Sequence, residues 1–466
     1  MNAPLIWIVF PFIGSFLLLL LNKQYRLVCI IQSFMSALLG LLIFFIPITQ
    51  PGMIPASGFQ ITSDLIFLGR SISIANHDRL LVGIYYGFLF IWTISIIILN
   101  ENSRIVPLGM AFVSLLITAT SVSPFLYAAL IIEIAVVLCV IMIHDQKDHQ
   151  SRGISRFLIF MTMGMSFILL SGWYLAGGEL SPVNETQLMQ ATVLLGLGFI
   201  FWLAVFPFYS WIPVIFEENQ PINTAFVLII LPIAVLNLMI RFLDGFSWLR
   251  NSNFVFQTLS YLGGVMVATG GLWALFQTKI RRILGFVFFI SNGALLISLG
   301  LNNVSGYFLF SYQILPRMIG FALFSWSIIW LEKKYGEGFD LFSTNSAIFE
   351  LPYSSVGLLI AIFSLAGMPL LASFPVIQTI YQQLASRSLF LVGMFVLGNG
   401  CISVVGFRLL SVMLSNNNQF GKPDESRNYK ILILLCVVLI FAIGSFPQFF
   451  LNGFGYFIQG FENLVK

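Results

Sequence analysis

The chain contains a long succession of apolar stretches, each about as long as a membrane helix. A helix needs roughly 20 predominantly apolar residues to cross a bilayer, and by that measure the 466-residue sequence holds about fourteen candidates. They cover approximately residues 4–21, 27–47, 80–99, 105–122, 125–143, 154–176, 188–207, 222–243, 254–276, 283–300, 306–331, 353–373, 388–411 and 431–450. We therefore predict an all-α polytopic membrane protein with about 14 transmembrane helices.

The composition agrees with this fold class. Hydrophobic residues make up 59% of the chain and charged residues only 9%, whereas soluble globular proteins carry about 25% charged residues. The 22 basic and 18 acidic residues are scattered and form no basic stripe, which argues against nucleic acid as a partner. The first stretch, 4–21, has no basic region or small-residue cleavage site, so we expect it to be retained rather than removed as a signal peptide.

The residues that usually carry soluble enzyme chemistry form no motif here. The four cysteines lie far apart in apolar stretches without a Cys-x-x-Cys pair, which excludes an iron–sulfur or zinc site: Cys29, Cys139, Cys401 and Cys436. The three histidines lie between apolar stretches: His77, His144 and His149. No glycine-rich phosphate loop or nucleophile motif occurs. We expect no catalytic, cofactor-binding or metal-binding residue on this chain.

One long loop, 48–79, interrupts the early stretches. It contains alternating apolar residues at Phe59 and Ile61, and again at Ile72 and Ile74. Such alternation is typical of strands, so we predict a short hairpin at the membrane surface.

Lysine and arginine are unevenly divided between the loops. Loops after odd-numbered stretches carry most of them: Lys23, Arg26, Arg104, Lys147, Arg152, Arg156, Lys279, Arg281, Arg282, Lys333, Lys334, Lys422, Arg427 and Lys430. Loops after even-numbered stretches carry Arg70, Arg79, Arg250 and Arg387. Because basic loops stay on the cytoplasmic side, we expect both termini on the opposite, non-cytoplasmic side.

Two charged residues lie near the centre of an apolar stretch, where a charge costs several kcal/mol and indicates function. Glu133 is a candidate proton-relay carboxylate, or alternatively a neutral or paired group that fixes helix packing. Arg317 stays protonated even when it is buried, so it suits holding a carboxylate, an anionic head group or water beside the Pro316 kink. Gln313, one turn earlier, could share its hydrogen bonds.

Prolines interrupt two of the stretches. The segment FPFYSWIP places Pro207 and Pro213 at the seventh stretch, and FSLAGMPLLASFP places Pro369 and Pro375 in the twelfth. Each proline removes a backbone hydrogen bond at membrane depth. Two such breaks, five stretches apart, are typical of inverted-repeat transporters, and they predict two inverted five-helix repeats with helices 7 and 12 broken.

These features divide the chain into four predicted parts. They are helices 1 to 3 with the loop hairpin (1–104), the first repeat (105–243), the second repeat (254–411), and a polar loop with the last helix (412–466).

Four segments resemble the antiporter-like subunits of respiratory complex I and their relatives, the Mrp antiporter and proton-conducting transporter family. They are FPFYSWIPVIFEENQPINTAF (206–226), QTKIRRILGFVFFISNG (277–293), FSLAGMPLLASF (363–374) and GFRLLSVM (406–413). The spacing after Trp211 is most similar to the subunit 2 branch, the bacterial subunit N type of NADH-quinone oxidoreductase. The histidine of the family's seventh-helix signature corresponds to Tyr209.

The resemblance implies a proton path along the membrane midplane, built from a glutamate and several lysines. The fifth-helix glutamate corresponds to Glu133. The family lysines are replaced by Trp202 on the seventh helix, Pro232 on the eighth and Ile377 on the twelfth, where Gln378 is adjacent. These three replacements cannot titrate, whereas a lysine can load and release a proton. The remaining candidates for a path are Glu133, Arg317, Gln378 and Tyr209.

By this resemblance the chain is a membrane subunit of a complex I-like NADH/quinone oxidoreductase, in the position of a proton-translocating subunit but with a degenerate channel. The implied partners are other membrane subunits and a peripheral arm that carries flavin and iron–sulfur clusters, with quinone as the substrate of the complex. The alternatives are a cation/proton antiporter subunit of the Mrp or hydrogenase type, and a non-pumping membrane scaffold. All three place the chain in an energy-coupling membrane such as the cytoplasmic or inner membrane.

Overall fold

The structure is a computed structural model that describes residues 2–46, 48–49, 61–67, 69–144, 151–176, 185–415, 425–458 and 460–465. Four residues named above lie outside the described residues: Phe59, Lys147, His149 and Lys422.

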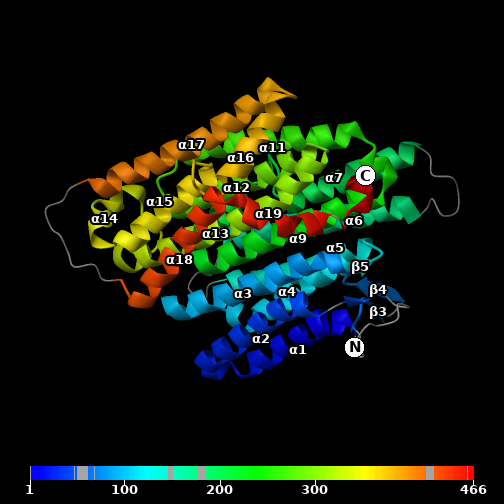
Figure 1. Ribbon diagram of the computed structural model, residues 1–466, viewed down its shortest axis with the longest axis horizontal. Coiled ribbons are helices and arrows are strands. Elements are labelled where there is room, and N and C mark those ends of the chain that lie inside the picture. The colour runs from blue at the N-terminus through cyan, green and yellow to red at the C-terminus, as the bar shows by residue number, and fades with distance from the viewer. Residues whose placement is uncertain are drawn as a thin grey trace.

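Helices make up nearly all of the described chain (Figure 1). In the first half they are a π-helical turn Leu5–Val9, α1 Phe10–Leu20, α2 Tyr25–Phe45, α3 Arg79–Leu99, α4 Ile105–Ser121, α5 Leu126–Ile143, α6 Arg152–Ala176, α7 Glu185–Trp202, α8 Trp211–Glu218 and α9 Pro221–Gly245. In the second half they are α10 Ser247–Arg250, α11 Asn253–Leu275, α12 Ile280–Gly300, α13 Val304–Tyr335, α14 Ala347–Glu350, α15 Pro352–Ala366, α16 Phe374–Ala385, α17 Leu389–Leu414, α18 Arg427–Ser445, α19 Pro447–Ile458 and α20 Glu462–Val465.

Many of these helices have the length and composition of membrane spans. Among the described helices, ten are long and apolar enough to cross a membrane, and three shorter apolar helices accompany them: Leu5–Leu20, Ile105–Ser121 and Pro352–Ala366. The predicted class, an all-α polytopic membrane protein, is thereby confirmed. The number of crossings and the two five-helix repeats stay predictions.

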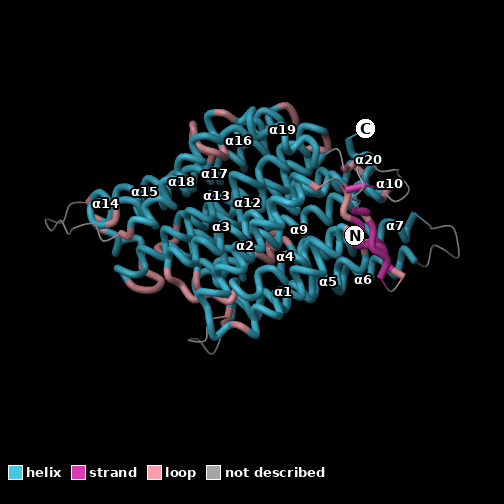
Figure 2. Tube along the Cα trace, turned by 60° about the horizontal axis from the view of Figure 1, so that its bottom comes forward, coloured by secondary structure: helices cyan, strands magenta, loops and turns pink. Residues whose placement is uncertain are grey.

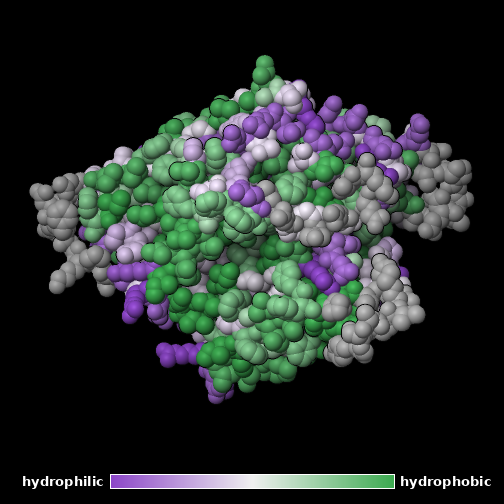
Figure 3. All heavy atoms as spheres, in the orientation of Figure 1, coloured by the Kyte–Doolittle hydropathy of each residue, from purple (hydrophilic) through white to green (hydrophobic). Residues whose placement is uncertain are grey.

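Three helices form the centre of the protein. In their most apolar windows, α9 and α12 are 94% buried and α13 is 83% buried, whereas α6 and α18 are only 33% and 28% buried. The outer helices expose large apolar side chains such as Phe45 and Leu389. Hydrophobic residues accordingly cover much of the face seen in Figure 3. The burial pattern is that of a helix bundle whose outer surface is solvated by lipid.

The few strands gather at the end of the molecule where the chain begins (Figure 2). Strand β3, Asp64–Phe67, pairs antiparallel with β4, Arg70–Ser73, and β4 pairs with β5, Val122–Ser123. Two shorter strands, β1 Ile48–Thr49 and β2 Ile61–Thr62, run parallel. A hairpin therefore lies in the long loop, with a third strand from the loop before α5.

The chain leaves helix geometry at the two proline-rich segments. Helix α7 ends at Trp202, and residues 203–210 are irregular before α8 begins. Helix α15 ends at Ala366, where Gly367 has a φ of +78°. In both places the helix stops several residues before the first proline of the segment, Pro207 or Pro369. Pro213 and Pro375 lie instead in the first turns of the following helices, where a missing N–H costs little.

A buried carboxylate from a distant segment completes the start of α15. Glu425, which is 7% exposed, accepts hydrogen bonds from the main-chain N–H groups of Tyr353 (3.2 Å) and Ser354 (2.8 Å). It also accepts a hydrogen bond from the Ser354 hydroxyl, and the Ser354 oxygen in turn accepts a hydrogen bond from the Tyr429 hydroxyl. A carboxylate at a helix N-terminus satisfies free N–H groups and complements the helix dipole, so Glu425 joins the start of α18 to α15.

Glycine contacts set the distance between α11 and α17. A Cβ atom added at Gly398 would lie 2.2 Å from the main-chain oxygen of Val267. We predict that Gly398→Leu lowers the free energy of unfolding by about 1–3 kcal/mol, because the helices must separate. Gly400→Leu is the matched control, since an added Cβ there meets nothing within 4 Å. Thermal unfolding in mild detergent measures both, and equal melting temperatures would refute the role of this contact.

Candidate functional site

Glu133 lies on α5 and is held by a hydroxyl group of α6. The Thr162 hydroxyl donates to its Oε1 atom at 2.6 Å. The other carboxylate oxygen, Oε2, is buried and has no hydrogen-bond partner among the described residues. No described lysine or arginine lies within ion-pair distance of Glu133, so its charge lacks the basic neighbour that a lysine of α7 would supply.

Trp202 fills the space beside α6 where the resemblance places a lysine. It is the last residue of α7, is 1% exposed, and donates its indole N–H to the main-chain oxygen of Met161 at 2.9 Å. A Cβ atom added at Gly164 would lie 2.3 Å from the indole ring, so the ring packs directly on that glycine. Met161 precedes Thr162, the partner of Glu133. The indole and the carboxylate therefore bind neighbouring residues of one helix.

The other replaced positions are also filled by packed apolar groups. Pro232 is buried inside α9, which continues as a helix through it. Ile377 on α16 is 4% exposed and packs against Gly367 of the preceding break, while Gln378 beside it is exposed. None of these positions presents a group that exchanges protons.

Tyr209 lies in the irregular segment between α7 and α8 and is half-buried. Its ring stacks on Phe289 of α12, with ring centroids 4.5 Å apart, and on Phe206 at 6.0 Å. These contacts make Tyr209 part of the packing of the break against α12.

Arg317 is the one cation buried in the centre of the described structure. It lies on α13 and is 1% exposed, and its Nη2 donates to the Oδ1 atom of Asn292 on α12 at 2.6 Å. The guanidinium also lies over the rings of Phe288 (4.6 Å) and Phe321 (5.7 Å). Its Nε and Nη1 atoms have no partner among the described residues. Asn292, rather than the expected Gln313, is its hydrogen-bond partner.

The four candidates for a proton path do not meet. Glu133, Tyr209, Arg317 and Gln378 lie on or near α5, α8, α13 and α16. The described residues include no hydrogen bond, ion pair or ring contact between any two of these side chains. These four side chains therefore have separate partners in the described structure.

A network of ion pairs, which sequence reasoning missed, joins the loops at one end of the helices. Glu217 pairs with Lys279 at 2.8 Å and with Arg282. Arg281, only 7% exposed, forms a two-pronged pair with Glu332. The signal was available in the sequence, since these acidic and basic residues all follow odd-numbered stretches.

Arg281 and Glu332 of this network also line a cavity of about 180 Å³ between α9, α12 and α13. Lys333 pairs there with Glu101 at 3.2 Å. Burial alone would raise the pKa of Glu217, but the hydrogen bonds and charges of Lys279 and Arg282 outweigh that effect and lower it. The charges at this end are therefore mutually compensated. Among the described residues no group of three or more histidine, cysteine or acidic side chains could hold a metal ion.

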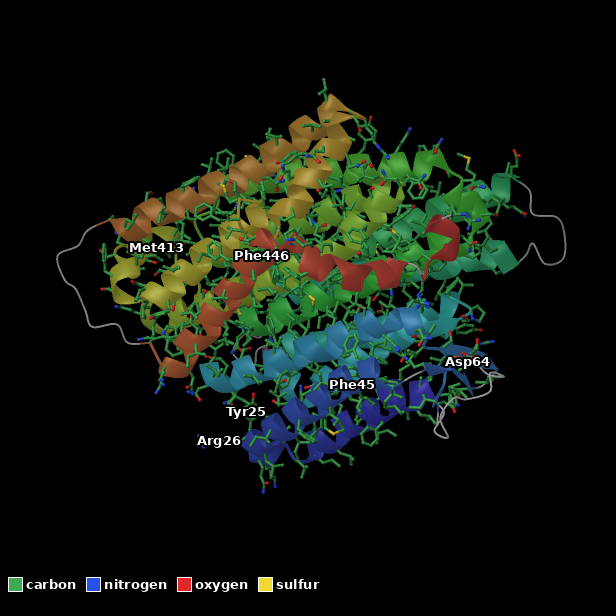
Figure 4. The ribbon with its side chains drawn as sticks, viewed as in Figure 1. Tyr25, Arg26, Phe45, Asp64, Met413 and Phe446 are labelled. Carbon is green, nitrogen blue, oxygen red and sulfur yellow. The ribbon has the colours of Figure 1, made fainter. Side chains whose placement is uncertain are left out.

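The opposite end carries the two described ends of the chain (Figure 1). Asn2 bridges to Thr62, and Asp244 accepts the main-chain N–H of Asn463 at 2.9 Å. Arg241 of α9 pairs with Asp78, which precedes α3, at 2.6 Å. In Figure 4, Tyr25 and Arg26 at the start of α2 and Met413 near the end of α17 lie toward the left, and Asp64 of β3 lies toward the right.

Comparison with known proteins gives the chain relatives of one kind. Residues 175–403 match the family described as NADH:quinone oxidoreductase/Mrp antiporter, transmembrane. The chain is 24% identical over 279 residues to NADH-quinone oxidoreductase subunit N of Ruthia magnifica subsp. Calyptogena magnifica, an alignment covering 58% of this chain and 56% of that relative. It is 24% identical over 369 residues to subunit N 1 of Thermodesulfovibrio yellowstonii, covering 75% of this chain and 78% of that relative.

Three solved structures share the fold. The membrane-bound sulfane sulfur reductase, an archaeal respiratory membrane complex, gives a TM-score of 0.83 at 18% identity, covering 100% of this chain and 98% of that one. The Mrp complex from Dietzia sp. DQ12-45-1b gives a TM-score of 0.80 at 13% identity, covering 100% of this chain and 99% of that one. Respiratory complex I from Thermus thermophilus gives a TM-score of 0.78 at 17% identity, covering 100% of this chain and 99% of that one. The sequence alignment thus spans little more than half of the first relative, whereas the fold matches over the whole chain.

The ion pair between Arg281 and Glu332 is expected to stabilise the end of the bundle. Arg281→Met should lower the free energy of unfolding by about 3 kcal/mol, because it leaves the Glu332 carboxylate buried without its cation. Arg282→Met is the matched control: its side chain is 41% exposed, and such pairs contribute about 1 kcal/mol or less. Chemical unfolding in detergent separates the two, and equal loss in both variants would contradict the burial argument.

Proposed function

The chain is an antiporter-like membrane subunit of the complex I and Mrp type, and we propose that it keeps this fold while its own proton path is closed. In a complex I-like NADH/quinone oxidoreductase it occupies the position of a proton-translocating subunit. Its contribution is to complete the membrane part of the assembly and to hold its neighbours, rather than to load and release protons itself.

The packing of Trp202 is the observation that carries this proposal. Its indole ring fills the space against Gly164 and gives its only N–H to a main-chain oxygen. A proton path needs titratable groups or water in a continuous row, and an indole fixed in this way supplies neither. Among the described residues, Glu133 has the Thr162 hydroxyl as its one hydrogen-bond partner.

Arg317 supports the same proposal. A guanidinium remains charged at any physiological pH, so it cannot pass a proton on. Fixed between Asn292 and two phenylalanine rings, it places a permanent positive charge among the central helices. A permanent charge of that kind repels protons and other cations from its surroundings.

The partners and cofactors follow from the same assignment. We propose that other membrane subunits and a peripheral arm bind this chain, and that flavin and iron–sulfur clusters lie on those partners. Quinone is then a substrate of the complex rather than a ligand of this chain. The support is that the curated relatives are named as subunits of NADH-quinone oxidoreductase.

We also propose that both termini lie on the non-cytoplasmic side of an energy-coupling membrane. The excess of lysine and arginine in the loops after odd-numbered stretches supports this orientation. A fluorescent protein fused after Lys466 should then stay dark in bacteria, while an alkaline phosphatase fusion at the same place should be active. A bright fluorescent-protein fusion together with an inactive alkaline phosphatase fusion would place the C-terminal end on the cytoplasmic side instead.

Purification and proton flux test the function together. Native protein purified in mild detergent should bring a flavin- and iron–sulfur-bearing arm with it. The isolated chain in liposomes should give proton flux no greater than protein-free liposomes, and Glu133→Gln should leave that rate unchanged. A pH-sensitive dye inside the liposomes measures the flux.

A matched variant separates a closed path from an unfolded protein. Thr162→Val removes the hydroxyl partner of Glu133 at nearly constant volume, and it should melt close to the wild type. Flux in the wild type that is abolished by Glu133→Gln would instead support the cation/proton antiporter. Recovery of the chain alone, without flux, would support the scaffold alternative.

A further inference from the structure

An apolar cavity of about 240 Å³ opens among α7, α9, α11 and the short helix α10. In Figure 1, α7 and α11 lie near the upper right of the molecule, with α9 below them. The lining is almost wholly apolar and includes Leu195, Phe199, Phe242, Leu249, Phe254 and Leu259. The hydroxyl of Thr192, also in the lining, already donates to the main-chain oxygen of Leu188 within its own helix. A polar substrate or an ion would find few hydrogen-bonding groups here.

The depth of the cavity matches one leaflet of a bilayer. Its lining runs from Phe254 to Leu262 on α11, about 12 Å at 1.5 Å per residue, and from Thr192 to Leu203 beside α7, about 16 Å. Half of a hydrocarbon core about 30 Å thick is about 15 Å. The cavity therefore begins near one end of the helices and stops near mid-membrane, as an acyl chain of one leaflet does.

A basic and an aromatic residue flank one lining residue of the cavity. Leu249 lines the cavity, and its neighbours in α10 are Trp248 and Arg250. Tryptophan is enriched at the head-group level of membranes. Arg250 donates to the main-chain oxygen of Asp244 at 2.7 Å and forms no ion pair with a described carboxylate. Its positive charge is thus left for an anionic group at the same level.

We propose that this cavity binds one acyl chain of an anionic phospholipid, whose phosphate lies beside Arg250. The apolar lining favours a hydrocarbon chain. The depth of about one leaflet favours a lipid whose head group lies at the near surface. The Arg250 guanidinium, which forms no ion pair with a described carboxylate, favours a negative head group. The bound lipid fills the space between α7 and α11 and so joins the first half of the chain to the second. This site is separate from the proton path and does not depend on the proposed function.

Lipid-dependent thermal stability of the delipidated full chain in detergent tests the proposal. Added dioleoyl phosphatidylglycerol should raise the melting temperature of the wild type by several degrees, and at lower concentration than dioleoyl phosphatidylcholine does. Gly196→Phe, which places a ring in the cavity, should abolish the shift. Gly393→Phe is the matched control, because both glycines have nothing within 4 Å of an added Cβ. Thr258→Phe serves as a second filling variant if Gly196→Phe does not fold.

The head-group contact is tested separately. Arg250→Gln should raise the phosphatidylglycerol concentration needed for half of the shift about fivefold, the ratio that corresponds to about 1 kcal/mol for one basic residue at a membrane surface. Arg387 is another arginine in a loop after an even-numbered stretch, and Arg387→Gln should change this phosphatidylglycerol concentration less than twofold. A full shift in both filling variants, or a shift by ubiquinone but not by phosphatidylglycerol, would overturn the proposal. Equal response of Arg250→Gln and wild type would overturn the head-group contact.

Discussion

Every backbone N–H and C=O group in hydrocarbon must find its partner within the protein, and this constraint determines the rest of the structure. It makes helices the units of the fold and makes their packing depend on close approach rather than on the hydrophobic effect. Glycines supply that approach. An added Cβ at Gly271 would lie 2.6 Å from the backbone of Gly398, and one at Gly263 would lie 2.5 Å from the carbonyl oxygen of Gly293. Helix α11 therefore packs closely against α12 and α17 because the helix surfaces lack side chains at these points.

The same constraint explains where many of the cations lie. The last carbonyl groups of a helix have no partner within it, and a basic side chain both satisfies them and complements the helix dipole. Among the described residues, six basic side chains donate to carbonyl groups at or near helix C-termini: Arg79 to Ile46, Lys333 to Leu99, Arg104 to Ile141, Arg250 to Asp244, Arg281 to Glu217, and Arg408 to Leu275. The basic residues that the positive-inside rule counts as loop charges therefore also complete helices of their neighbours. Arg317 is different, since among the described residues it donates to the Asn292 amide oxygen and lies over two phenylalanine rings but reaches no helix C-terminus.

The fold class could be predicted from the sequence because length and apolarity are local properties. The breaks after Trp202 and Ala366 could also be anticipated, since proline acts on its own helix. The hairpin was expected from alternating residues, but its third strand, Val122–Ser123, was not, because its pairing with β4 spans about fifty residues. The pair of Arg241 with Asp78 was not predicted for the same reason, since 163 residues separate the two in the sequence. Trp202 could be placed in the sequence but not in space, since only the structure shows Gly164 opposite its ring.

Two contacts made by the last part of the chain have a consequence for the order in which the protein is made. Glu425 completes the N-terminus of α15, and the backbone at Asn463 and Leu464 binds Asp244 at the end of α9. The N–H groups at the start of α15 and the Asp244 carboxylate therefore lack these partners during synthesis until the later residues have been made. Until then α9 and α15 are inserted but incompletely bonded. Glu425, Asn463 and Leu464 complete the hydrogen bonds of these two helices after the helices have entered the membrane.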